Sequence, residues 1–279
     1  MTASPSAPVA RLRVPPHAYF LVSATFHYLG PAFAVLLFAR VDVLGVAWLR
    51  IVSAALIFAL WRRPWHAFTR AVLAWGAVLA VMNCCFYLAI DRLPLGTVAA
   101  IEFLPVIALA ALGVRSRRNL AALVLAVGGV YLVTGVQFAA EPLGLAFAFA
   151  NAGLFAAYIV LADRVAKDSS LTGIDGLAAA MLIAAIVVTP MAGWATVPAF
   201  ADPVAVLAGI GVGVSSSVIP YVTDQLALAL LPRATYALMV SLLPATATVI
   251  GVVVLTQVPT VAETAGVALV VGGVALHRA

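Results

Sequence analysis

The sequence predicts an all-α integral membrane protein with ten transmembrane helices, arranged as two inverted repeats of five helices, with both termini in the cytoplasm. The prediction depends on three observations: an apolar composition, ten apolar runs of spanning length, and a one-sided distribution of basic residues. Apolar residues fill 65% of the 279 positions and charged residues only 9%, whereas a soluble domain has about 25% charged residues. A soluble fold would have to expose very large apolar patches, so we expect most of the chain to lie in lipid.

The ten runs each approach the length of about 20 apolar residues that a helix needs to cross a bilayer. They occupy residues 17–39, 43–61, 71–90, 94–113, 119–138, 142–162, 173–195, 203–230, 234–256 and 260–277. The connections between them are short and leave no room for a soluble domain. We therefore expect a multi-pass protein of the cell (cytoplasmic) membrane, in contact with the lipid bilayer and not with nucleic acid.

The basic residues test this count, because a missed span would scramble their alternation between the two sides. With the N-terminus in the cytoplasm, only Arg40 and Arg92 fall on the outer side, and Arg50 lies within a span. All the others fall on the cytoplasmic side, and they are Arg11, Arg13, Arg62, Arg63, Arg70, Arg115, Arg117, Arg118, Arg164, Lys167, Arg233 and Arg278. This bias is the one that orients membrane proteins, with positive charge inside.

Two pairs of segments indicate an internal repeat. AALVLAVGGV at 121–130 is similar to AGVALVVGGV at 265–274, and RLPLGTVAAIEFLP at 92–105 is similar to LLPRATYALMVSLLP at 230–244. Five spans per copy is an odd number, so the second copy would enter the membrane from the opposite side, which is a common transporter plan. The predicted organisation is a disordered cytoplasmic tail at 1–16, a first repeat at 17–138 and a second at 139–279.

Ionisable residues inside spans are the strongest functional signal, because each costs on the order of 3 kcal/mol at a helix centre. Glu102, Asp224, His27 and Arg50 lie within predicted spans. Glu102 is about 12 Å from the end of its span, so it needs a partner or a watery cavity. We predict proton coupling for Glu102, Asp224 and His27. Arg50 is a candidate partner for either acid or for a substrate carboxylate, and the alternative is a structural arginine that reaches toward the surface.

Uncharged polar residues inside spans are candidates for lining a substrate cavity. The segment GVGVSSSVIPYVTDQ at 211–225 is the most polar, and a proline-interrupted helix with polar groups is typical of transporter sites. The alternative is that these groups only hydrogen-bond between helices. The substrate-binding candidates are Arg50, Asn83, Tyr87, Asn151, Tyr158, Ser216, Tyr221 and Ser241.

Metal, cofactor and disulfide chemistry are not expected. Cys84 and Cys85 are adjacent within an apolar run, where neighbouring residues on a helix cannot easily reach disulfide geometry, and no wider Cys/His spacing suggests zinc. We interpret both cysteines as small packing residues.

Several segments resemble the EamA type of the drug/metabolite transporter superfamily, in particular the threonine and homoserine exporter group. They are SSVIPYVTDQLALALLP (216–232), YALMVSLLPATATVIG (236–251), RLPLGTVAAIEFLP (92–105) and GVAWLRIVSAALI (45–57). The resemblance implies a ten-helix carrier whose cavity is lined mainly by spans 1, 3, 4, 6, 8 and 9, with Glu102, Tyr221 and Asp224 matching the family pattern. Leu104 and Leu243 depart from it, because the family usually has Gly and an acid before the two prolines.

These observations favour a secondary active transporter, and not an enzyme, that exports amino acids or similar small metabolites by alternating access. We expect an antiporter coupled to protons, working as a monomer or a homodimer. The alternative is a membrane-embedded enzyme or a lipid-handling protein without transport activity. An enzyme would need paired aspartates, an HExxH motif or a Ser/His pair at suitable spacing, and the sequence contains none of these arrangements.

Overall fold

A computed structural model describes residues 15–113, 116–137, 141–167, 172–231, 239–240 and 242–276 of the chain. All the regular secondary structure of its described part is helical, with no strand. The elements are α1 (Pro16–Leu37), α2 (Val43–Arg62), α3 (Arg70–Ile90), α4 (Leu95–Gly113), α5 (Arg117–Gln137), α6 (Pro142–Ala166), α7 (Gly173–Ala192), η1 (Gly193–Ala201), α8 (Pro203–Gly213), η2 (Val214–Val218), α9 (Ile219–Leu230), α11 (Leu243–Leu255) and α12 (Val261–Leu276).

Helix ends follow from local sequence signals. Asp42 begins α2, and its side chain accepts a hydrogen bond from the amide of Leu44 at 2.9 Å. At the start of α12, the Thr260 amide donates to the Glu263 carboxylate at 2.8 Å, and the Glu263 amide donates to the Thr260 hydroxyl at 3.2 Å. This reciprocal pair is a capping box, which satisfies amides that a helix start leaves unpaired.

The predicted spans correspond to this helical architecture. Each overlaps one described helix, except that 173–195 contains α7 and reaches into η1, and 203–230 contains α8, η2 and α9. In the described part of the chain, six helical segments are long and apolar enough to cross a membrane: 16–37, 43–62, 70–90, 142–166, 173–201 and 203–224. The structure is therefore that of a multi-pass membrane protein, while the count of ten spans and the side of each terminus stay predictions.

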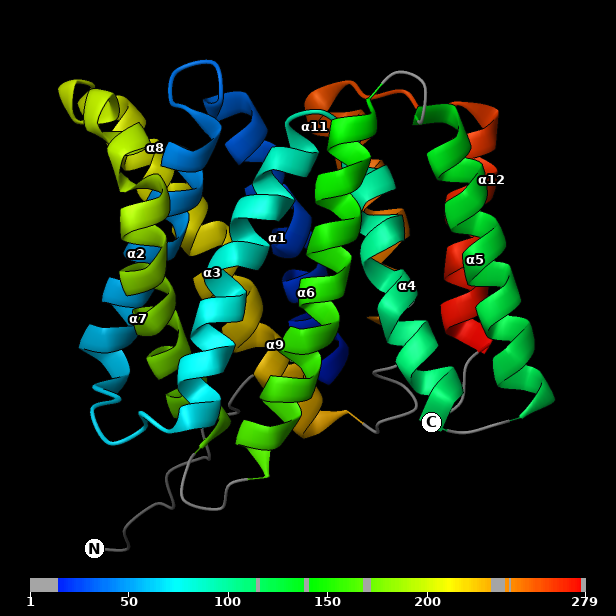
Figure 1. Cartoon of the computed structure of the whole chain (residues 1–279), viewed down its shortest axis with the longest axis horizontal. Coiled ribbons are helices and arrows are strands. Elements are labelled where there is room, and N and C mark those ends of the chain that lie inside the picture. Colours follow the sequence, from blue (N-terminus) through cyan, green and yellow to red (C-terminus); the bar gives the residue numbers. More distant parts are fainter. Residues whose placement is uncertain are drawn as a thin grey trace, which may run out of the picture.

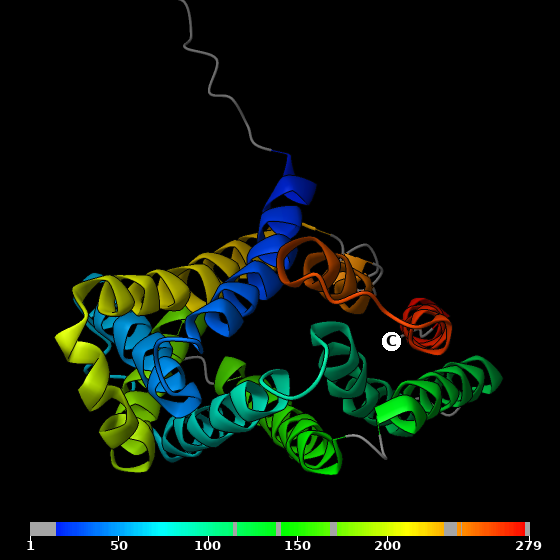
Figure 2. The same cartoon turned by 90° about the horizontal axis from the view of Figure 1, so that it is seen from above.

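The helix contacts form equivalent pairs when each of the first five helices is exchanged with a later counterpart. The counterparts are α6 for α1, α7 for α2, the α8–η2–α9 segment for α3, α11 for α4 and α12 for α5. The contact of α3 with α6 has its counterpart in that of α9 with α1, and α4 with α6 in α11 with α1. The contacts α2 with α7, α4 with α11 and α5 with α12 map onto themselves. Figures 1 and 2 show the resulting layout, with α2, α7 and α8 at one end of the long axis and α5 and α12 at the other.

The contact between α5 and α12 is reciprocal at the level of residues. A Cβ added to Gly129 would lie 2.5 Å from the carbonyl oxygen of Gly266, and one added to Gly273 would lie 2.7 Å from that of Ala122. In the similar segments identified above, Gly129 aligns with Gly273 and Ala122 with Gly266. The same close backbone approach, which only small residues permit, is thus made twice.

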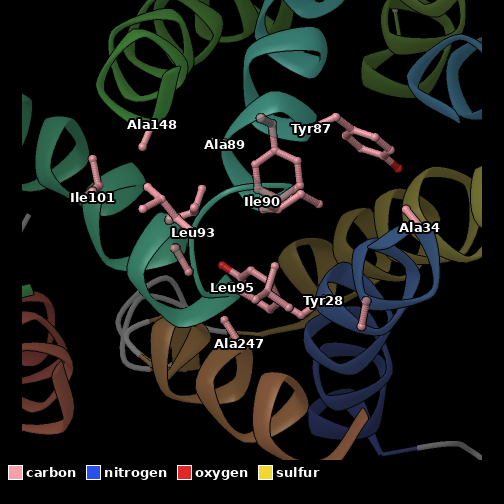
Figure 3. Close-up of a cluster of buried hydrophobic side chains, with 14 of the residues drawn as sticks. Tyr28, Ala34, Tyr87, Ala89, Ile90, Leu93, Leu95, Ile101, Ala148 and Ala247 are labelled. Carbon is pink, nitrogen blue, oxygen red and sulfur yellow. The ribbon is translucent and has the colours of Figure 1, made fainter. Parts of the chain in front are cut away.

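The largest hydrophobic core joins α1, α2, α3, α4, α6 and α11. Tyr28, Leu95 and Ile101 are fully buried in it, together with Ala148 and Ala247. Figure 3 shows Tyr28 of α1 beside Leu95 of α4, with Ala247 of α11 close by. This cluster packs the first helix against helices from both halves of the chain.

The two edges of the bundle differ in charge. At the lower edge in Figure 1, α1 begins, α2 gives way to α3, and α6 ends. Those segments carry Arg62, Arg63, Arg70, Arg164 and Lys167. The opposite edge carries Arg40 and Arg92 in the connections after α1 and α3. We refer to the first as the basic edge and to the second as the opposite edge.

Candidate functional site

A cavity of about 460 Å³ lies between α1, α3, α4, α6, α7, α9 and α11. Its lining near the basic edge includes Phe20 at the start of α1, Ala166 at the end of α6 and Gly173 at the start of α7. Its lining farther along these helices includes His27 and Glu102. The cavity therefore extends from the basic edge toward the middle of the bundle.

Glu102 is the carboxylate in the deep part of the cavity. Its residue surface is only 8% exposed, and its Oε1 accepts a hydrogen bond of 3.2 Å from Nδ2 of Asn151 on α6. Asn151 is fully buried, and its own Oδ1 has no hydrogen-bond partner. Because buried polar atoms are nearly always paired, this oxygen beside Glu102 is an acceptor available to a donor.

Asp224 is the second intramembrane acid at the cavity. The hydroxyl of Ser23 on α1 lies 3.1 Å from the carbonyl oxygen of Pro220 and 3.4 Å from Oδ1 of Asp224. Ser23 therefore links α1 to α9 where the cavity passes between them. Tyr221 and Asp224 both line the cavity from α9.

The segment before α9 is a π-helical turn, η2, formed by the serine-rich sequence Val214–Val218. Pro220 has no amide hydrogen, so it cannot donate to the carbonyl of Ser216 four residues earlier. Arg50 of α2 donates to that carbonyl through Nη2 at 3.2 Å, and through Nε to the Ser217 hydroxyl at 3.1 Å. Turns of this kind are frequent at functional sites, and here Arg50 ties the turn to α2.

Aromatic side chains form one wall of the cavity. Trp75 of α3 lies next to Tyr158 of α6, with 5.4 Å between ring centroids, and Phe155 stacks on Tyr158 at 6.0 Å. All three residues line the cavity. The cavity thus combines a deep carboxylate with a broad apolar wall.

The structure brings five of the predicted site residues to the cavity, namely Glu102, Asp224, His27, Tyr158 and Tyr221. Five others lie outside its lining, namely Arg50, Asn83, Tyr87, Asn151 and Ser216. Ser241 lies outside the described residues.

The residues outside the lining make contacts between helices. Asn83 donates to the carbonyl of Ala47 at 3.2 Å, which joins α3 to α2. Tyr87 is fully buried, and the Arg50 guanidinium lies 5.5 Å from the centre of its ring. Asn151 contacts the cavity indirectly through Glu102, and the carbonyl of Ser216 accepts a hydrogen bond from Arg50.

Sequence reasoning missed Ser23, Trp75, Phe103 and Phe155, which all line the cavity. A single serine in α1 carries no signal by itself. An aromatic residue in an apolar run has the same sequence context whether its side chain faces lipid, the protein core or a cavity. Only the packing of α1, α3, α4 and α6 distinguishes these places.

The opposite edge is closed between α4 and α11. The amide of Leu95 at the start of α4 donates to Oε1 of Gln257 at 3.0 Å. Gly96 approaches Thr248 of α11 so closely that an added Cβ would overlap the threonine hydroxyl. We call this set of contacts the α4–α11 closure.

A helical membrane bundle with a cavity that opens at one edge, is closed at the other and holds a buried acid has the architecture of a membrane transporter. Comparison with known proteins makes the class specific, because residues 142–278 match the EamA-like transporter family. The chain is 29% identical over 248 residues to the threonine/homoserine exporter RhtA of Salmonella typhimurium, covering 83% of this chain and 80% of that protein. It is also 29% identical over 239 residues to the same exporter of Escherichia coli, with the same coverage.

The second half of the chain is therefore similar to the EamA-like transporter family, and together with the exporter relatives this similarity indicates a transporter and not an enzyme. A solved crystal structure shares the fold, with a TM-score of 0.57 and 18% identity over 94% of this chain and 97% of the other. The family match covers the second half of the sequence, and the relatives extend the similarity into the first half.

Proposed function

We propose that this protein is a proton-coupled secondary transporter that exports amino acids or similar small metabolites by alternating access. The observation that carries the proposal is the cavity itself, open at the basic edge, closed at the opposite edge, and holding Glu102 in its deep part. With positive charge inside, the open edge faces the cytoplasm. That is the state in which an exporter receives its substrate.

The proposed topology is ten spans in two inverted repeats, 17–138 and 139–279, with both termini in the cytoplasm. The matched helix contacts support it, as do the reciprocal approaches at Gly129 and Gly273. In such a plan, the substrate site lies where the repeats meet. Glu102 and Asn151 come from α4 and α6, one from each half.

Glu102 is proposed as the main proton-binding group, with Asp224 and His27 as further proton-handling groups on the same cavity. An intramembrane carboxylate can alternate between a protonated state and a charged state that binds another cation. Exchange of a proton for a substrate at Glu102 would couple export to proton entry. Tyr158 and Tyr221 are proposed to contact substrate directly, and Arg50 and Ser216 to hold η2 in place.

The test uses purified protein in liposomes with an imposed pH gradient and a mixture of labelled amino acids that includes threonine and homoserine. The relatives named above are threonine/homoserine exporters, which makes these two substrates the natural first choice. We expect uptake that follows the pH gradient and collapses with a protonophore. Failure of every amino acid, and of tryptamine as a small-metabolite probe, to move under a gradient would contradict the proposal.

The variant Glu102→Gln tests the assigned role. Loss of a charged hydrogen-bonding group is worth about 1.5–3 kcal/mol, so we expect gradient-driven transport to fall at least about tenfold. Glu141→Gln is the matched control, because Glu141 precedes α6 and does not line the cavity. Coupling that survives Glu102→Gln unchanged would remove Glu102 from the mechanism.

A further inference from the structure

We propose that the preferred substrate is an amine cation with a large apolar or aromatic body and no carboxylate. This inference rests on the proposed transport function and names the substrate class of the same cavity. It differs from what the names of the relatives suggest, because threonine and homoserine are small, polar and carry a carboxylate.

The charges on the cavity wall favour a cation. Among its described lining residues are the acids Glu102, Asp163 and Asp224, and there is no lysine or arginine. Asp163 forms an ion pair with Lys167 at the basic edge, whereas Glu102 lies in the deep part of the cavity. A low-dielectric cavity with carboxylates attracts a positively charged group.

Hydrogen-bonding capacity near Glu102 also fits an ammonium group. An ammonium has three donors and no acceptor. Glu102 has its carboxylate oxygens, and the adjacent Oδ1 of Asn151 is buried without a partner. Glu102 of α4 therefore offers carboxylate acceptors to a primary amine in the cavity, and the Asn151 amide of α6 holds that carboxylate from behind the lining.

Arg50 is the nearby cation that could pair with a substrate carboxylate, but its donors are hydrogen-bonded to other groups. Its Nε and Nη2 donate to Ser217 and to the carbonyl of Ser216, and its guanidinium lies over the ring of Tyr87. Arg50 does not line the cavity. A zwitterionic amino acid would thus find no lysine or arginine among the described lining residues to pair with its carboxylate.

The volume and the aromatic lining of the cavity indicate the size and the apolar character of the substrate body, meaning the part other than the ammonium group. A cavity of about 460 Å³ is within the range of pockets that enclose drug-sized molecules. Trp75, Phe155 and Tyr158 supply aromatic surface from α3 and α6. Aromatic rings stabilise both an apolar ligand body and a nearby cation.

The experiment compares three labelled probes on the purified wild-type protein: tryptamine, tryptophan and threonine. Tryptamine is tryptophan without its carboxylate, so the pair isolates that one group. Equilibrium binding in detergent and gradient-driven transport in liposomes are measured separately. We expect tryptamine to bind at least tenfold more tightly than tryptophan or threonine, and to be transported in preference to both.

The outcomes separate this inference from the transport proposal. Transport of threonine or tryptophan with no binding of tryptamine would overturn the substrate class and leave the transporter intact. Binding of tryptamine without transport of any probe would support the substrate class and overturn the transport function. Absence of both binding and transport for all three probes would overturn both.

Two variants locate the ammonium and the body of tryptamine. Glu102→Gln should weaken tryptamine binding more than tryptophan binding, because it removes the charge that favours a cation. Trp75→Leu should weaken the binding of tryptamine. It should leave the binding of ethylamine, which has no aromatic body, almost unaffected. Glu141→Gln serves again as the control, and equal loss of both probes in Glu102→Gln would contradict the assigned contact.

Discussion

The two edges of the bundle differ in how closely their helices approach one another. At the basic edge, the helix ends are held apart around a cavity that includes Asp163 and Gly173 in its lining. At the opposite edge, α4 and α11 touch through Gly96 and Thr248 and through the hydrogen bond from Leu95 to Gln257. The difference teaches that access is controlled by how closely helices approach, since charged residues lie at both edges and only one edge is closed.

The largest expected contrast is in access for a water-soluble thiol reagent. In a background in which Cys84 and Cys85 are replaced by Ala, Ile159→Cys places a thiol on the cavity wall, and Thr97→Cys places one in the closure. A membrane-impermeant maleimide added to inside-out vesicles should label the first and spare the second. Labelling of Thr97→Cys with protection of Ile159→Cys would show that the open and closed edges are reversed.

A second, smaller effect is expected from enlarging Gly96. In Gly96→Val, the new side chain overlaps Thr248, and overpacking of this kind costs about 1–3 kcal/mol. We expect a lower unfolding temperature and a closure that is more often open. Gly128→Val is the control, because a Cβ there meets nothing within 4 Å, and its unfolding temperature should stay the same or rise. Equal effects of the two substitutions would mean that the approach at Gly96 is not tight.

A third test removes the hydrogen bond of the closure. Gln257→Leu leaves the amide of Leu95, a fully buried residue, without its acceptor, and an unsatisfied buried group costs about 1–3 kcal/mol. Hydrogen exchange at the start of α4 should become faster. Gln257→Glu keeps an acceptor oxygen in the same place and should keep exchange slow. Unchanged exchange in Gln257→Leu would exclude this bond from the closure.

The smallest effect is expected for a surface ion pair at the opposite edge. Arg40 and Asp202 lie 3.4 Å apart, with side chains 61% and 42% exposed. Exposed pairs contribute about 0–1 kcal/mol, so Arg40→Gln should barely change stability or reagent access. A large change would show that charge pairing holds the closure, contrary to the comparison drawn above.

Much of the fold and part of the site could be predicted from the sequence. The apolar runs predicted the helices because bilayer thickness dictates their length. Glu102, His27 and Asp224 stood out because an ionisable group in lipid is costly, and all three line the cavity. The segment at 211–225 stood out for its serines and proline, and it contains η2 and the start of α9.

The rest depended on contacts between distant residues. Asn151 pairs with Glu102 across 49 positions, and Ser23 reaches Pro220 across 197. No local pattern specifies such partners. Arg50 was a candidate for a substrate carboxylate, yet its donors are directed to Ser216 and Ser217, because Pro220 removes the amide donor to the Ser216 carbonyl in η2, and η2 packs against α2.

The reciprocal approach of α5 and α12 has a consequence for assembly. Gly129 contacts the backbone at Gly266, and Gly273 contacts it at Ala122, so the surface on one helix is matched by its own counterpart on the other. A self-complementary surface of this kind is what joins the two subunits of a symmetric dimer. The helices α5 and α12 therefore each carry a surface that fits its own equivalent, so two copies of either helix would be able to pack against each other in the same way.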